Sequence, residues 1–169
     1  IGAHNLPMQL TSFVGRETEM ADVTRLLDEN RLVTLIGAGG AGKTRLAIQV
    51  AARLAPGLRE GACYVDLAPI TDPDVVPIAA ARALGLPDQP GRSIMETLAR
   101  SIGDRNLLVV LDNCEHLLDA SAELVVAVLG SCSAAAVLAT SREPVGAPGE
   151  VTRQVPSLSL ADEAVELFT

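Results

Sequence analysis

A glycine-rich run in the first third of the chain has the composition and spacing of a phosphate-binding loop. Residues 37–44 fit the pattern G-x-x-x-x-G-K-[ST] at every position. Glycines let successive backbone N–H groups point at phosphate oxygens, and the positive end of the following helix dipole adds to the attraction. Lys43 is the only lysine among 13 basic residues, and its compact ammonium suits the space between β- and γ-phosphates better than a planar guanidinium. The run therefore predicts that a nucleoside triphosphate or diphosphate binds to Gly37, Ala38, Gly39, Gly40, Ala41, Gly42, Lys43, Thr44 and Arg45.

A second polar signal lies about seventy residues further on. The apolar run 107–111 ends in Asp112, which is the Walker B pattern. An aspartate in this position holds Mg²⁺, usually through water, beside the hydroxyl of the phosphate loop. Alone, such an aspartate could equally cap a helix. Combined with the loop upstream, it predicts a metal site made by Thr44 and Asp112.

Hydrolysis would also need a group that orients or deprotonates water. Asn113 stands where many active ATPases have a second acid. Glu115 could serve instead, or it could be a first-turn residue stabilised by a helix dipole. Arg142 follows a later strand and would point toward a γ-phosphate if that strand lies beside the first one; otherwise it would pair with Glu143 at the surface. Hydrolysis is expected to be slow, and the candidate catalytic residues are Lys43, Asp112, Glu115 and Arg142.

The same glycines allow a second interpretation. Gly37, Gly39 and Gly42 fit G-x-G-x-x-G, the fingerprint of Rossmann-type dinucleotide-binding domains, and Asp66 ends the next strand about where a ribose-binding acid belongs. This fingerprint predicts neither the Lys-Thr pair that follows nor a second acid at the end of a later strand. The phosphate-loop interpretation is therefore favoured.

The elements that must position these residues alternate between apolar strands and amphipathic helices. Strands are expected at 31–36, 62–67, 107–111, 135–139 and 151–155. Helices are expected at 17–28, 43–54, 71–84, 93–102 and 117–129, with a last one starting near Ser159. Thr71 and Ser93 are predicted N-caps, because each has an acidic residue three positions later. Continuous apolar strands alternating with helices indicate an α/β domain whose parallel sheet is covered on both faces.

Composition narrows the classes of partner. A chain of 169 residues suits one domain. Its net charge of −8 argues against direct binding of nucleic acid by this segment. It has neither an apolar run near the roughly 20 residues needed to cross a bilayer nor a signal-peptide pattern. The three cysteines are expected to be reduced, buried thiols of a cytoplasmic protein, because the metal-ligand set Cys63, Cys114, His116 and Cys132 lacks a paired CxxC spacing.

Several stretches together resemble the NB-ARC domain, a nucleotide-binding domain of the STAND class of P-loop ATPases. They are 13–17, the loop 37–44, 111–116 and 139–143, with further matches at 66–73 and 155–160. The sequences of these stretches are most similar to those of bacterial transcriptional regulators of the AfsR/SARP type and relatives with LuxR-type output domains. The resemblance implies a three-layer P-loop NTPase fold with a five-stranded parallel sheet in the order 5-1-4-3-2. It also implies that Phe13, Val14 and Arg16 lie against the adenine and that Arg142 is the first sensor.

The resemblance further implies a regulatory switch that uses ATP, ADP and Mg²⁺. ADP would hold a closed form and ATP would permit opening and assembly, with Arg142 supplying the difference in affinity. Residues 1–169 are expected to be the NB-ARC domain of a larger regulator, monomeric in isolation, with DNA-binding and sensor domains elsewhere in the same protein. Because this family adds helical and winged-helix segments that complete the nucleotide site, the domain alone is expected to bind nucleotide weakly. An efficient ATPase is the alternative function.

Overall fold

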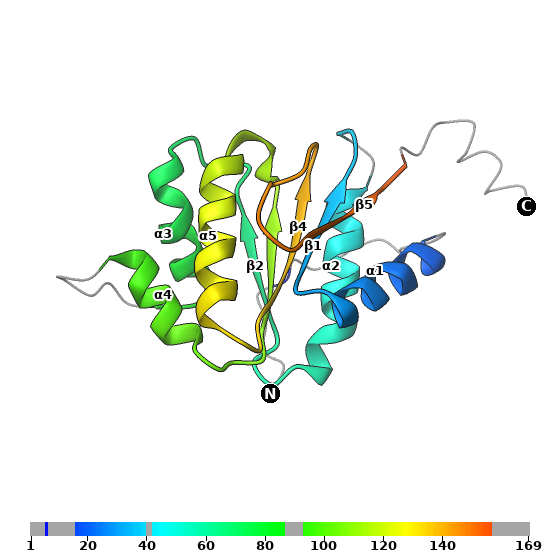
Figure 1. The fold of residues 1–169 in the computed structure, drawn as a ribbon. Helices are drawn as coiled ribbons and strands as arrows, with labels where there is room; N and C mark the ends of the chain where they lie inside the picture. The colour runs from blue at the N-terminus through cyan, green and yellow to red at the C-terminus, as the bar shows by residue number, and fades with distance from the viewer. Residues whose placement is uncertain (1–5, 7–15, 40–41, 87–92, 157–169) are drawn as a thin grey trace, which may run out of the picture.

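The fold is built on one parallel sheet with the strand order β2-β3-β4-β1-β5. The computed structural model describes residues 6, 16–39, 42–86 and 93–156. Within them the strands are β1 (Leu32–Ile36), β2 (Ala62–Asp66), β3 (Leu108–Asp112), β4 (Ala136–Ser141) and β5 (Glu150–Gln154). All of these strands point the same way (Figure 1). The order is the predicted 5-1-4-3-2 counted from the other edge, so this expectation is confirmed.

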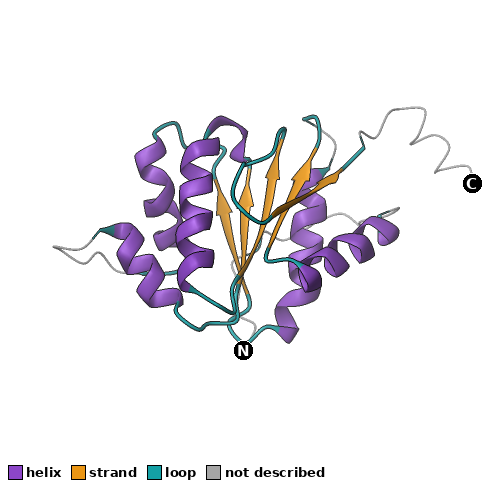
Figure 2. Ribbon diagram, viewed as in Figure 1, coloured by secondary structure: helices purple, strands orange, loops and turns teal. Residues whose placement is uncertain are grey.

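Helices cover both faces of the sheet and make a three-layer domain (Figure 2). One face carries α1 (Glu17–Glu29) and α2 (Lys43–Leu54). The other carries α3 (Val76–Ala83), α4 (Ile94–Ile102) and α5 (Leu118–Ser131). Short 3-10 turns lie at Ala55–Gly57 (η1), Pro73–Val75 (η2) and Cys114–His116 (η3). Among the helices of the described residues, none is both long and apolar enough to cross a bilayer.

Side chains along each buried strand alternate between two apolar cores. In β3, Leu108 and Val110 pack with residues of α1 and α2, whereas Val109 and Leu111 pack with residues of α3, α4 and α5. This alternation follows from the two-residue period of a strand. Asp112 is in phase with Val110, so it lies on the α1–α2 face at the carboxyl end of the strand.

One predicted helix start is wrong, and a proline explains why. Asp72, and not Thr71, provides the cap: its Oδ1 accepts a hydrogen bond of 2.9 Å from the Asp74 N–H. A proline disfavours helical backbone in the residue before it, so Asp72 stays extended and the chain turns at Pro73 into η2 before α3 begins at Val76. The Ser93 cap is confirmed, since its Oγ accepts from the Glu96 N–H at 3.1 Å.

The strand order also decides against the Rossmann interpretation. In that fold the second strand is adjacent to the first. Here β1 pairs with β4 and β5, and β2 lies at the far edge beside β3. Asp66 accordingly pairs with Asp112 on β3, and its Oδ1 accepts hydrogen bonds from the Ala68 N–H and from Asn113 Nδ2.

Candidate functional site

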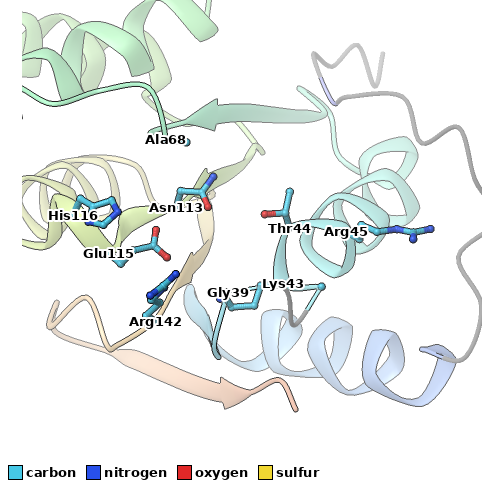
Figure 3. A pocket seen from close by; sticks show the side chains of 10 residues that line it. Gly39, Lys43, Thr44, Arg45, Ala68, Asn113, Glu115, His116 and Arg142 are labelled. Atoms are coloured by element: carbon cyan, nitrogen blue, oxygen red, sulfur yellow. The ribbon is translucent and has the colours of Figure 1, made fainter. Parts of the chain in front are cut away.

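A cavity of about 380 Å³ opens at the carboxyl edge of the sheet, between the glycine loop and the ends of β3 and β4 (Figure 3). We call it the loop cavity. Its size falls within the range of about 300–1,000 Å³ that is usual for small-molecule sites. Lys43 and Thr44 lie on one side of it, and Glu115 and His116 lie on the other (Figure 3). The full lining is Gly39, Gly42, Lys43, Thr44, Arg45, Ala68, Asn113, Glu115, His116 and Arg142.

Two glycines of the loop differ in what a side chain would meet there. Gly42 has a φ of +85°, a left-handed conformation that strains any residue with a side chain. At Gly39 an added Cβ would lie 2.8 Å from Nη2 of Arg142, so the end of that flexible side chain would have to shift. The Gly37 N–H donates to the Ser141 carbonyl at 3.3 Å, which ties the start of the loop to the end of β4. Gly40 and Ala41 lie outside the described residues.

Lys43, the first residue of α2, is only 8% exposed and points back into the loop. Its Nζ donates hydrogen bonds to the carbonyl oxygens of Gly37 at 2.6 Å and Ala38 at 2.9 Å. Burial lowers the pKa of Lys43; Glu115 acts against this shift, Arg142 adds to it, and Asp112 opposes it. The loop carbonyls thus hold the ammonium at the wall of the cavity.

Asp112 is 1% exposed and accepts hydrogen bonds from three hydroxyl groups on three different elements. Thr44 Oγ1 at the start of α2 donates to Oδ1 at 2.8 Å and Oδ2 at 3.0 Å. Tyr64 on β2 donates to Oδ2 at 2.5 Å, and Thr140 on β4 donates to Oδ1 at 2.5 Å. Burial, together with the bond to Asp112, raises the pKa of Tyr64, so its hydroxyl stays a donor. The predicted pair of Thr44 and Asp112 is therefore in contact.

Sequence reasoning missed Tyr64 and Thr140. The available signal was the alternation of side chains along each strand. Thr140 comes two residues after Leu138, which packs on the α1–α2 face, so Thr140 must point to the same face. Tyr64 likewise packs on that face of β2. A hydroxyl in such a run needs a polar partner, because buried polar groups are almost always hydrogen-bonded. Which partner it meets depends on the strand order, which a single strand does not reveal.

Asn113 makes a sharp turn after the Walker B strand. Its φ of 65° is the only positive value outside glycine among the described residues. The Asn113 N–H donates to Thr140 Oγ1 at 2.9 Å, and its Nδ2 donates to Asp66 Oδ1 at 3.1 Å. This turn starts η3, which buries Cys114 in the core and brings Glu115 to the loop cavity. Glu115 thus lies in a 3-10 turn before α5 and not in the first turn of the helix.

Arg142 follows β4, which does lie beside β1, as the sensor hypothesis requires. Its guanidinium lies over Gly39 at the loop cavity. The ion pairs within the described ranges do not include one between Arg142 and Glu143. The geometry therefore brings Arg142 to the predicted place, and its role as a sensor stays a prediction.

The residues predicted to lie against adenine are less fully described. Arg16 is 3% exposed and pairs with Glu19 at 2.6 Å. Its Nη2 lies 3.5 Å from the position that a Cβ on Gly42 would take, so it packs against the end of the loop. Phe13 and Val14 lie outside the described residues. Arg45 is at the cavity edge, but its side chain points away from the other labelled residues (Figure 3).

The three cysteines contribute to the cores and not to the loop cavity. Cys63, Cys114 and Cys132 are free and buried, as predicted. Burial raises the pKa of Cys63 and of Cys114 to about 12. Within the part of the chain that the structure describes, no three His, Cys, Asp or Glu side chains are grouped so that they could hold a metal ion.

The sequence of this chain matches a known protein family over most of its length. The family model described as Novel STAND NTPase 1 matches residues 7–145. The chain is a STAND NTPase domain. The STAND class implied by the sequence resemblance is thereby confirmed, whereas the narrower NB-ARC assignment stays a prediction.

Relatives of this STAND domain are parts of much longer proteins. It is 65% identical over 143 residues to a Mycobacterium tuberculosis protein whose name places it among HTH-type transcriptional regulators; the match covers 85% of this chain and 16% of that protein. The regulatory protein AfsR of Streptomyces coelicolor is 34% identical over 126 residues, which are 64% of this chain and 13% of AfsR. A STAND protein with a tetratricopeptide repeat sensor from Pyrococcus horikoshii has the same fold, with a TM-score of 0.61 at 16% identity, over 97% of this chain and 27% of that one.

Proposed function

We propose that this STAND domain is a nucleotide-dependent switch module of a larger transcriptional regulator, which binds ATP or ADP with Mg²⁺ and hydrolyses ATP slowly. The observation that carries the proposal is convergence. Lys43, Thr44 and Arg142 line one cavity, and the buried carboxylate of Asp112 lies directly behind Thr44, to which it is hydrogen-bonded. Two of these groups are cationic in a chain of net charge −8, so the cavity concentrates positive charge where a phosphate chain would lie.

The side chains present fit a nucleotide with its cation. Lys43 already donates to two neutral carbonyls, which a phosphate oxygen can replace as a better acceptor. Gly39 has no side chain of its own, so its backbone lines the cavity directly below the Arg142 guanidinium. Thr44 and Asp112 offer hydroxyl and carboxylate oxygens, the ligand types that Mg²⁺ prefers. Held by Thr44 and Asp112, a bound Mg²⁺ would neutralise part of the phosphate charge.

Each residue then has a definable task. Lys43 would exchange its carbonyl partners for β- and γ-phosphate oxygens, and the N-terminus of α2 would add its dipole. Thr44 and Asp112 would hold the cation. Arg142, beside Gly39, would contact the γ-phosphate and favour ATP over ADP. A ligand shifts a conformational equilibrium only through such a difference in affinity, so Arg142 is the residue through which the switch would distinguish its two states.

Slow hydrolysis is proposed because the position after Asp112 is occupied by an amide that is already engaged. Asn113 donates to Asp66 and cannot accept a proton from water. Glu115 is the one acid among the residues that line the loop cavity, which makes it the candidate base. An efficient ATPase is the second candidate. In that case Glu115→Gln should lower a substantial turnover rate by about a hundredfold or more, whereas a binding switch would show little turnover to lose.

The remaining part of the proposal concerns partners. The name of the M. tuberculosis relative associates this type of domain with transcriptional regulation and that of AfsR associates it with regulation, and this chain spans only 16% and 13% of those proteins. We assign DNA binding and signal sensing to other domains of the same regulator, because a net charge of −8 makes this segment unsuited to nucleic acid. The domain alone would be monomeric, and ATP-bound full-length protein would assemble.

Calorimetric titration with ATP and with ADP, each with Mg²⁺, tests the proposal. We expect dissociation constants of roughly micromolar order or weaker, where a micromolar constant corresponds to a binding free energy of about −8 kcal/mol. Lys43→Ala should abolish binding while circular dichroism shows an intact fold, and the matched control Arg53→Ala, which removes a cation from the outer end of the same helix, should change nothing. Arg142→Ala should weaken ATP about tenfold more than ADP. Unchanged affinity in Lys43→Ala would refute the phosphate loop, and equal losses in Arg142→Ala would remove the sensor.

A further inference from the structure

Three hydroxyl groups are hydrogen-bonded to the carboxylate of Asp112. An ionised carboxylate has about four lone-pair sites, two on each oxygen. Tyr64 takes one site on Oδ2, and Thr140 takes one on Oδ1. Thr44 shares a single proton between both oxygens, at 2.8 and 3.0 Å. Thr44, at the end of the glycine loop, is therefore the one of these three donors that is shared by both oxygens.

The sheet fixes this arrangement through strand register. Tyr64 pairs with Val110, two residues before Asp112 on the adjacent strand. Tyr64, Val110 and Leu138 all pack in the core on the α1–α2 face. A tyrosine is long enough to reach from its own position on β2 to the end of β3, and its ring is held by that core. The packing of the ring thus fixes the position of the Tyr64 hydroxyl beside Oδ2 of Asp112.

We propose that Tyr64 is a positioning residue for the metal site: by holding Oδ2 of Asp112, it orients the carboxylate toward Thr44 and toward the cation of a bound Mg–nucleotide. This inference rests on the proposed function of the loop cavity. Outer partners that orient a metal-binding carboxylate commonly change metal affinity by about 10- to 100-fold when they are removed. Tyr64 does not line the loop cavity, so its effect on nucleotide affinity should pass through the cation alone.

Tyr64 gives a cleaner test than the other hydroxyl on this carboxylate. Thr140 also accepts the Asn113 N–H, so its loss disturbs the backbone. Tyr64→Phe keeps the ring in the core and removes only the hydroxyl. A matched control is Thr34→Val, which removes another buried hydroxyl that donates to a carboxylate, Glu150 Oε2, at 2.6 Å. Thr34 is out of phase with Val33 and Leu35, so it lies on the opposite face of the sheet from Asp112.

The first measurement compares nucleotide affinity with Mg²⁺ and with a chelator, using calorimetry on the 169-residue chain and its variants. Tyr64→Phe should lose about tenfold of the affinity gained from Mg²⁺ and keep the metal-free affinity. Thr34→Val should behave as the wild type in both conditions. A Tyr64→Phe variant that keeps the full gain from Mg²⁺ would overturn the inference. So would equal losses with and without Mg²⁺, because these would mean that the hydroxyl acts only on the fold.

The second measurement needs no nucleotide. The chain has one tyrosine and no tryptophan, so its intrinsic fluorescence comes from Tyr64 alone. A phenol that donates to a carboxylate is quenched, because the excited phenol gives up its proton readily. Asp112→Asn should therefore raise the emission, whereas Thr34→Val should leave it unchanged; unchanged emission in folded Asp112→Asn would overturn the contact. If the wild type bound no nucleotide at all, the proposed function would fail, and the emission would still decide whether Tyr64 holds Asp112.

Discussion

Thr140 connects two features of the site, and replacing it with valine should cost much more stability than replacing it with serine. Its side chain is fully buried; Oγ1 donates to Asp112 Oδ1 at 2.5 Å and accepts from the Asn113 N–H at 2.9 Å. Valine has nearly the same shape but supports neither bond. Serine keeps the hydroxyl and loses only a methyl group. The pair of variants therefore separates the polar contribution from the packing contribution.

The expected magnitude follows from the two bonds. Loss of a hydrogen bond to a charged group costs about 1.5–3 kcal/mol, and a buried N–H left without a partner costs about 1–3 kcal/mol. The two together predict that Thr140→Val loses about 3–5 kcal/mol, the middle of the summed range. Loss of one methyl group in Thr140→Ser should cost about 1 kcal/mol. The difference between the variants is then about 2–4 kcal/mol, a large share of the 5–15 kcal/mol typical of a domain.

Urea unfolding followed by circular dichroism would measure this difference. With an m-value of about 2 kcal/mol per molar, Thr140→Val should unfold about 1–2 M earlier than Thr140→Ser. Both variants should keep the helical spectrum before the transition. Midpoints that agree within about 0.25 M, which is about 0.5 kcal/mol, would refute the reasoning, since they would mean that neither bond stabilises the folded state.

Two further perturbations test the charges and thiols around the site. Asn113→Asp should destabilise the domain by about 1 kcal/mol at pH 7, because it replaces the amide that donates to Asp66 at 3.1 Å with a second carboxylate; the exchanged pair Asp66→Asn with Asn113→Asp should recover stability in urea unfolding, and no recovery would argue against the contact. The pKa values of Cys63 and Cys114 are raised from 9.0 to about 12 in the fold. Their contribution to stability is therefore complete below pH 9 and lost as the pH rises from 9 toward 12, by up to about 1.4 kcal/mol per pH unit for each thiol. Urea unfolding across this range should show the decline, and it should be smaller in Cys63→Ala; an identical decline in both proteins would contradict the assignment.

Periodicity located most of the elements, because buried runs of a fixed period leave a clear mark on a sequence. The helix predicted at 43–54 has those bounds in the structure, and the helix after Ser93 ends at Ile102 as expected. Strand ends were shifted by one or two residues. β4 continues to Ser141 because that residue still pairs with Ile36, and such pairing is invisible in the apolar run at 135–139. The pattern of apolar residues thus locates the buried centre of a strand, whereas pairing with the neighbouring strands determines where the strand ends.

The site was predictable to the extent that its residues are adjacent in the chain. Lys43 and Thr44 follow from the loop pattern, and Asp112 from a strand that ends in an acid. Tyr64 and Thr140 were not found, since their contact with Asp112 exists only once β2, β3 and β4 lie side by side in register. The strand order itself was expected only from the family resemblance. The residue pattern of one strand does not show which other strands will lie beside it, so contacts between strands far apart in sequence could not be predicted from it.

The position of β1 in the sheet has a consequence for how the domain is made. The strand that ends in the glycine loop is synthesised early, but both of its partners come late: Leu32 pairs with Val137 on β4 and with Glu150 on β5. At about 5–20 residues per second, the ribosome needs roughly 5–20 s to add the hundred residues between them. Until β4 and β5 are synthesised, β1 and the loop that follows it have no neighbouring strand to pair with. Bringing β4 back to β1 closes a segment of about a hundred residues, which is a slow and entropically costly step. Nascent chains that are halted before β4 should therefore carry the complete loop sequence without the cavity that it helps to form.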